Sequence, residues 1–264
     1  MSFSRVIKNA FAEWLSMKQA ELRHGSHRWT VLCFHEVMDR QAFVDLLNKV
    51  DELYGVVSLS EGFESLRSGA ADRPLLTLTF DDADKTVWEN CLPELRRRRL
   101  PASLFVCTGF VDAGFREVST GRYSVMSWND LKDWAEAGLE VGSHTVNHIP
   151  LNQATIERSK WEILESKQIL EKRLGVEVRS IAYPWGYYTA NLDDWLQKDG
   201  SFATICTTIP RDNYPGDRGK HIYRKPAPQP SMLRAGLKNP TLYETVRAAH
   251  QQSVLRGLAP VVWR

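Results

Sequence analysis

Two pairs of residues in this chain have the types and spacing of a catalytic metal site. Asp81 and Asp82 stand side by side at the end of an apolar run over 75–80, and His144 and His148 are four positions apart. Two histidines and one carboxylate can bind a divalent ion and still leave open positions for water and a substrate. Together the two pairs therefore indicate metal-assisted hydrolysis.

Each pair on its own has a simpler explanation. Asp is a favoured N-cap residue, so Asp81 and Asp82 could merely cap a helix that begins near Lys85. A spacing of four on a helical turn would put both imidazoles on one side, but an isolated HxxxH pattern is often exposed or structural. The interpretation of a site therefore depends on whether the two pairs come together.

The surrounding pattern predicts that they do. Apolar, β-rich runs that predict strands alternate with runs of helical periodicity, which is typical of a parallel βα architecture. Strands are expected at 29–34, 56–59, 75–80, 102–107, 139–143, 179–183 and 202–207, and helices at 43–53, 85–98, 129–137, 156–174 and 192–198, with a helical turn at 62–68. Four of these strands end at His35, at Asp81, at His144 and at Pro184. In βα barrels the carboxyl ends of the strands form the active rim, so these residues should converge.

Composition supports one large α/β domain. The chain has 264 residues, of which 43% are hydrophobic, and its net charge is only +2, so bulk charge does not indicate a nucleic acid partner. The cysteines are far apart and are expected to be small buried hydrophobes, not disulfides or thiolate ligands: Cys33, Cys91, Cys107 and Cys206. The oligomeric state stays open.

The two ends of the chain differ from its middle. Residues 3–22 have an apolar face at helical spacing, which predicts an amphipathic helix within an N-terminal extension, 1–28, before a catalytic domain at 29–264. That face could pack on the domain or contact a membrane surface. Charges throughout the first 28 residues argue against a cleaved signal peptide, so we expect a cytoplasmic protein, peripheral to the inner membrane. Residues 209–230 predict a surface loop and 242–255 a last helix.

Three short motifs, taken together and in their order, resemble those of a known enzyme family. TFDD at 79–82, SHTVNH at 143–148 and AYPWG at 182–186 follow strands in that order, and with them the chain resembles the polysaccharide deacetylase family, also called the NodB-homology or carbohydrate esterase 4 family, from about 31 to 207. The resemblance implies a distorted (β/α)7-type barrel. It also implies a metal-dependent enzyme that removes the acetyl group of an N-acetylated amino sugar, giving a free amine and acetate.

The resemblance assigns roles to the two aspartates and the two histidines. Asp82, His144 and His148 match the metal ligands of the family, and the metal is expected to be Zn²⁺ or another divalent ion such as Co²⁺ or Ni²⁺. Asp81 matches the general base that takes a proton from the metal-bound water. The chemistry agrees, because a carboxylate that is off the metal is free to accept that proton.

The general acid has two candidates. His35, within LCFHEV, resembles the histidine of an N-terminal MYH motif in members that deacetylate extracellular poly-N-acetylglucosamine. His221, within HIYRKP, is the late histidine, but its context does not match the family's LxLH-like motif. We therefore favour His35.

Other positions are expected to face the substrate or to depart from the family. The substrate-binding candidates are Tyr183, Pro184, Trp185 and Arg224, with Trp128, Tyr187 and Tyr188 as further aromatic platforms. Trp185 also matches the residue whose backbone N–H stabilises the oxyanion.

Three positions depart from the family. Ala83 replaces the usual Gly and predicts an ordinary backbone conformation. Ala182 replaces an Arg that orients the base, a role for which Arg224 is a candidate. Asp84 could be a surface residue or could support the site.

Two other functions remain open at this point. The same scaffold could hydrolyse an amide or imide of a non-sugar molecule, or the chain could be a degenerate glycan-binding protein. If the protein is cytoplasmic, its substrate is expected to be a lipid-linked or nucleotide-linked saccharide.

Overall fold

The computed structural model describes residues 28–69, 71–118, 121–217 and 219–227. The helices expected at 3–22 and 242–255 lie outside these residues, as does most of the extension 1–28.

A single curled sheet forms the centre of the described chain. Its strands are β1 (Trp29–Phe34), β2 (Gly55–Val56), β3 (Leu75–Asp81), β4 (Ser103–Val106), β7 (Glu140–Ser143), β8 (Ser180–Ala182), β9 (Thr204–Cys206), β10 (His221–Ile222) and β11 (Lys225–Pro226). Every residue of β1 and β3 is buried, as expected of continuous apolar runs in a parallel sheet.

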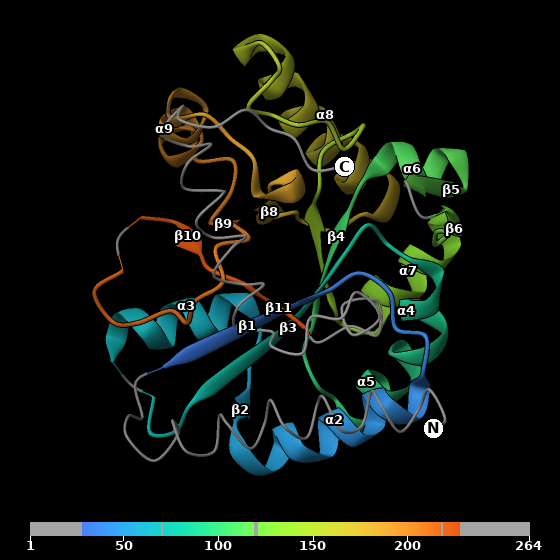
Figure 1. The fold of residues 1–264 in the computed structure, drawn as a ribbon, viewed down its shortest axis with the longest axis vertical. Helices are drawn as coiled ribbons and strands as arrows, with labels where there is room; N and C mark the ends of the chain where they lie inside the picture. The colour runs from blue at the N-terminus through green and yellow to red at the C-terminus, as the bar shows by residue number, and fades with distance from the viewer. Residues whose placement is uncertain (1–27, 70, 119–120, 218, 228–264) are drawn as a thin grey trace.

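The strand order shows that the sheet is bent into a barrel-like shape. The order is β10-β9-β8-β7-β4-β3-β1-β11, with β2 beside β3, and the pairs within it are parallel. β10 and β11 lie at opposite ends of this order, although only residues 223 and 224 separate them in the sequence. The sheet must therefore curl until its two edges approach each other, as Figure 1 shows. This confirms the prediction of a single distorted α/β barrel.

Helices surround the sheet, and most begin at a side chain suited to capping. They are α2 (Arg40–Leu53), α3 (Leu59–Ser68), α4 (Lys85–Asn90), α5 (Leu92–Arg98), α6 (Thr108–Ala113), α7 (Trp128–Glu136), α8 (Ile156–Leu174) and α9 (Ala190–Asp199). Side chains at the N-caps accept backbone N–H groups in α2, α3, α4, α7, α8 and α9. The single helix predicted over 85–98 is two helices that meet at Cys91. Pro93 explains the break, because it has no N–H to donate to the preceding turn.

Three other segments differ from the sequence-based expectations. The strand predicted at 56–59 ends early, because Ser58 caps α3 in a capping box with Glu61. Residues 108–118 and 121–124, which had no predicted element, contain α6 and the antiparallel pair β5 (Phe115–Val118) and β6 (Gly121–Ser124). The predicted loop over 209–230 contains the edge strands β10 and β11.

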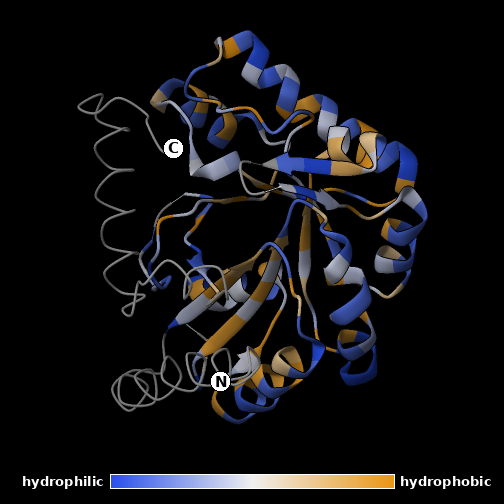
Figure 2. Ribbon diagram, turned by 45° about the vertical axis from the view of Figure 1, so that its right-hand side comes forward, coloured by the Kyte–Doolittle hydropathy of each residue, from blue (hydrophilic) through white to orange (hydrophobic). Residues whose placement is uncertain are grey.

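The hydrophobic core lies between the sheet and the helices. Phe80 of β3 is fully buried and contacts the rings of Phe34, Phe43 and Trp134, which come from three different elements. Figure 2 shows hydrophobic stretches in the strands at the centre, while the surrounding helices carry both hydrophilic and hydrophobic residues. All four cysteines are buried and none of them forms a disulfide, as predicted. Among the described helices, none is long and apolar enough to cross a membrane.

Candidate active site

The register of the sheet brings the predicted strand ends to one level. β1 pairs with β3 so that Phe34 lies opposite Phe80, which places His35 level with Asp81. β4 pairs Val106 with Ser143, the residue before His144. A cavity of about 370 Å³ opens at this rim. Its lining comprises Cys33, His35, Asp81, Asp82, Phe110, Arg116, Glu117, His144, Asn147, His148, Trp185, Thr208, Arg224 and Pro226.

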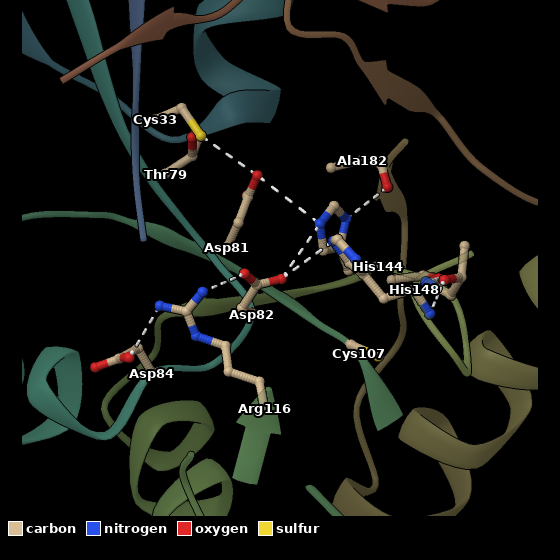
Figure 3. A network of polar contacts seen from close by, with 12 residues as sticks. Cys33, Thr79, Asp81, Asp82, Asp84, Cys107, Arg116, His144, His148 and Ala182 are labelled. Carbon is tan, nitrogen blue, oxygen red and sulfur yellow. Dashed lines mark hydrogen bonds and ion pairs between the residues drawn. The ribbon is translucent and has the colours of Figure 1, made fainter. Parts of the chain in front are cut away.

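The three residues expected to bind metal point toward one another, as Figure 3 shows. Oδ1 of Asp82 lies 3.6 Å from Nε2 of His144 and 3.4 Å from Nε2 of His148. The ligand atoms of all three residues lie within 4.8 Å of one another. Oδ1 of Asp82 is buried and has no hydrogen-bond partner. A buried carboxylate oxygen without a donor, facing two imidazole nitrogens, fits a divalent cation.

The protonation states also fit metal binding. Nδ1 of His144 lies 2.8 Å from the carbonyl oxygen of Ala182, which can only accept, so this nitrogen carries the proton and Nε2 is free to ligate. Burial lowers the pKa of His148 to about 4, although Asp82 opposes the shift, so His148 is neutral at neutral pH. Burial raises the pKa of Asp82, but the nearby histidines and Arg116 outweigh it and keep that pKa below the usual value.

The loop that carries both histidines is not the helical turn that their spacing suggested. Residues 144–148 are irregular, and Thr145 and His148 have positive φ angles of 70° and 51°. The N–H of His148 donates to Oγ1 of Thr145 at 3.1 Å, which tightens the loop. The imidazole centroids are 4.8 Å apart. Tertiary contacts, and not helical periodicity, therefore bring the two rings together.

Asp81 is held by a buried arginine from the far edge of the sheet. Both terminal nitrogens of Arg224 donate to the carboxylate of Asp81, at 2.7 and 2.9 Å, and Arg224 is 1% exposed. Cys33 donates its thiol to the same carboxylate at 3.3 Å. Burial raises the pKa of Asp81, but the charge of Arg224 outweighs this effect and holds that pKa far below its usual value. Asp81 is therefore ionised and fixed in orientation.

Arg224 thus lies where a partner that orients Asp81 is needed in the absence of an arginine at Ala182. The Nε of Arg224 donates to the backbone carbonyl of Thr207, so hydrogen bonds to other protein groups hold the guanidinium in place. Direct contact of Arg224 with a substrate stays a prediction.

The turn after β3 overturns the expectation for Ala83. Asp82 and Ala83 both have left-handed backbones, with φ of 68° and 55°, although Ala83 is not glycine. The N–H of Met126 donates to the carbonyl of Ala83 at 2.8 Å and helps to hold this turn. The helix cap is Asp84, which is buried and accepts the N–H of Thr86 at 3.0 Å. Asp81 and Asp82 are therefore not the cap of α4 and are available to the site.

Arg116 is a site residue that the sequence reasoning missed. It projects from β5, is 5% exposed, and pairs with Oδ2 of Asp82 at 3.1 Å. It also pairs with Glu36 and Asp84. Arg116 occupies Oδ2 of Asp82 and leaves Oδ1 toward the histidines (Figure 3). No motif marks this arginine, because only the fold of the hairpin brings it to the rim.

The two candidates for the general acid lie in different places. His35 lines the cavity beside the two aspartates. His221 is outside the cavity lining, and its Nε2 contacts Asp193 at 2.7 Å. The hydroxyl of Tyr183 donates to the same carboxylate, so Asp193 already joins His221 to a separate polar cluster. The geometry therefore favours His35.

Of the aromatic candidates, Trp185 lies at the cavity. It is 44% exposed, has a positive φ of 52°, and its ring centroid is 4.2 Å from that of His148. Phe110, which the sequence did not suggest, also packs against His148, with 5.5 Å between the two ring centroids. The other candidates, Tyr183, Pro184, Trp128, Tyr187 and Tyr188, are not among the lining residues.

Comparison with known proteins identifies the family of this chain. The family model described as polysaccharide deacetylase matches residues 68–201, half of the chain. The chain is 27% identical over 139 residues to a poly-beta-1,6-N-acetyl-D-glucosamine N-deacetylase of Staphylococcus aureus (strain N315), which covers 49% of this chain and 47% of that protein. The chain spans about half the length of the curated relatives it matches.

Solved structures share the fold. IcaB from Ammonifex degensii superposes with a TM-score of 0.68 at 24% identity, over 84% of this chain and 97% of that one. The Streptococcus pyogenes deacetylase PplD, solved in complex with acetate, gives a TM-score of 0.64 at 23% identity, over 81% and 100%. With its matched family model and its Asp82, His144 and His148 cluster, the chain belongs to the polysaccharide deacetylase family.

Proposed function

We propose that this protein is a metal-dependent N-deacetylase that hydrolyses the acetamide of an N-acetylated amino sugar to a free amine and acetate. The observation that carries the proposal is the meeting, in one cavity, of an arginine-held carboxylate, a metal-ligand cluster and a histidine: Asp81, Asp82, His144, His148 and His35. Family membership and the S. aureus relative support the same chemistry.

Asp82, His144 and His148 would hold the metal, for which we propose Zn²⁺ because imidazole and carboxylate ligands suit it. When bound, such an ion lowers the pKa of a water molecule and polarises the acetamide carbonyl.

Asp81 is the proposed general base. Its ion pair with Arg224 keeps it ionised and holds one orientation, so it can accept the proton of the attacking water. The charge of Arg224 lowers the basicity of Asp81. Asp81 therefore binds a proton less tightly, but it is always in the ionised state that the reaction needs.

His35 is the proposed general acid. An amine is expelled only if its nitrogen gains a proton, and His35 lines the cavity next to the aspartates. The backbone N–H of Trp185 is the proposed donor to the oxyanion of the tetrahedral intermediate, a contribution of roughly 3 kcal/mol for donors of this kind. The exposed indole of Trp185 gives an apolar surface on which a sugar ring can stack.

The experiment is to measure acetate release by the purified full chain from N-acetylglucosamine oligomers, with and without added Zn²⁺. Asp81→Asn should lower kcat by roughly 10²- to 10⁴-fold, because proton transfer is lost. Its bound metal should stay the same, since Asp81 is not a ligand. His144→Ala should lose both metal and activity. Acetate release by either variant at the wild-type rate would refute the proposal.

His221→Ala is the matched control for His35→Ala. Both remove one histidine, but His221 pairs with Asp193 outside the cavity lining. We expect only His35→Ala to reduce turnover strongly. Cyclic amides serve as rival substrates, and their hydrolysis in place of N-acetyl sugars would favour the non-sugar alternative.

We further propose, from the apolar face of residues 3–22 alone, that the chain associates peripherally with the cytoplasmic face of the inner membrane and acts on a lipid-linked or nucleotide-linked saccharide. Removal of residues 1–22 without any change in membrane fractionation would contradict this.

A further inference from the structure

Glu162 is a fully buried carboxylate that the proposed chemistry does not use. It lies on α8 and is 0% exposed. Its Oε2 accepts the backbone N–H groups of Val146 and Asn147, at 3.0 and 2.8 Å. Its Oε1 accepts from the side chains of Asn147 and Arg158, at 2.9 and 2.7 Å. All four contacts are donors to Glu162, and three of them come from the loop that carries the two histidines.

The same loop is held from the opposite side by the start of α6. The carbonyl of Val146 accepts the N–H of Gly109 at 2.8 Å and the thiol of Cys107 at 3.0 Å. The carbonyl of Thr145 accepts the N–H of Thr108 at 3.2 Å. Val146 is thus bound at its N–H by Glu162 and at its carbonyl by Gly109. The peptide between the two metal ligands is clamped between α8 and α6.

This clamp matters because the loop is strained. Thr145 and His148 both adopt left-handed conformations that β-branched and bulky side chains disfavour. Such conformations persist only when the surroundings over-determine them. The loop has no glycine that would make this shape easy. Without Glu162, three donors of the loop would lose their acceptor, and His148 would be free to leave its position beside Asp82.

We propose that Glu162 is a positioning residue for the metal site, which sets metal affinity by holding the loop that presents His148. The inference rests on the proposed metal site but not on the substrate. Glu162 acts through Val146 and Asn147 and does not touch the ion.

The test is a titration of the metal-free full chain with Co²⁺, in which the visible absorption of the bound ion measures binding. Glu162→Ala should weaken binding by roughly 10- to 100-fold, as is typical when a partner of a ligand-bearing group is removed. Glu162→Gln should fall between wild type and Glu162→Ala, because its amide oxygen can still accept the two backbone N–H groups.

Glu140 supplies the matched control. It is also a mostly buried glutamate, at the opposite end of the strand that leads into the loop, and it accepts from Ser103 and Ser180, both at 2.7 Å. Glu140→Ala and Glu140→Gln should lower the melting temperature of the metal-free protein and leave Co²⁺ affinity within about twofold of wild type.

The possible outcomes test the metal site and the role of Glu162 separately. Wild-type protein that binds no Co²⁺ would refute the metal site itself. Wild-type protein that binds Co²⁺, with Glu162→Ala binding equally well or with Glu140→Ala weakened as much, would overturn the role of Glu162 alone. If Glu162→Ala does not fold, the comparison of Glu162→Gln with Glu140→Gln decides in the same way.

Discussion

The turns that carry the site and the turns that end the helices both use left-handed backbone, but with different residue types. Five of the six non-glycine residues with positive φ in the described chain lie in the site turns: Asp82, Ala83, Thr145, His148 and Trp185. Several helices end instead at glycines with positive φ: Gly69, Gly114, Gly175 and Gly200. A Cβ added at any of these four glycines would meet no atom within 4 Å.

The difference follows from what each turn must present. A helix end needs only a change of direction, which glycine allows at little steric cost. The site turns must also carry a carboxylate, an imidazole and an indole, so they keep side chains in conformations that cost energy. Contacts from distant elements, such as Arg116 on Asp82 and Glu162 on the histidine loop, hold them in place. Disrupting these contacts should therefore cost more than altering a helix end.

The largest expected effect is that of Arg116→Met. This change leaves the buried carboxylates of Asp82 and Asp84 without their cation, and breaking such a pair typically costs about 3–5 kcal/mol. Urea unfolding of the metal-free protein measures the loss. Added Zn²⁺ should recover part of it, because the ion would neutralise Asp82.

Arg122→Met is the control in the same hairpin. Arg122 packs over the ring of Phe115, a contact worth roughly 0.5–1 kcal/mol at an exposed site. Equal losses for the two variants would show that Arg116 has no special part in holding the turn.

The next effect is a pH dependence that originates at His148. Its pKa falls from 6.5 to about 4 on folding, mainly through burial. Between pH 4 and 6.5 the folded protein therefore binds fewer protons than the unfolded chain. The contribution of His148 to the free energy of unfolding is fully present above pH 6.5 and is lost as the pH falls toward 4. The loss should reach about 3 kcal/mol, at 1.36 kcal/mol per pKa unit.

Urea unfolding of the metal-free protein across this range, compared with His148→Gln, measures that contribution. A variant with the same pH slope as wild type would place the effect elsewhere.

A smaller loss is expected for Gly109→Ala. The new Cβ would lie 2.6 Å from the carbonyl oxygen of Val146, so the histidine loop has to move. Overpacking of this kind costs about 2 kcal/mol. We expect Co²⁺ affinity to fall together with stability. Unchanged affinity would mean that the loop can shift without displacing its histidines.

The smallest effect is that of Gly175→Ala at the end of α8. The site is open but has a φ of +68°, so we expect a loss of about 1 kcal/mol from left-handed alanine. Calorimetric unfolding measures this, and Co²⁺ affinity should not change. A loss as large as that of Gly109→Ala would remove the distinction between the two kinds of turn.

The parts of the site that could be predicted lie next to strands. His35, Asp81 and His144 follow buried runs whose pattern reveals where each strand ends, and parallel strands share one rim. Arg224 was a candidate only because Ala182 lacks the family's arginine, and its segment was predicted to be a loop. Arg116 had no signal, since nothing local distinguishes it from an exposed arginine. Ala83 and the spacing of His144 and His148 were misread, because local preference favours ordinary backbone and a helical turn.

The amino-acid sequence by itself determined the alternation of strands and helices, the caps of most helices and the identity of the reactive residues, because these depend on short-range periodicity and side-chain chemistry. The tertiary structure decided which carboxylate each arginine meets, which histidine reaches the cavity and how strained turns are held. These depend on contacts such as that between Asp81 and Arg224, which are 143 positions apart. Only the closing of the sheet brings such residues together.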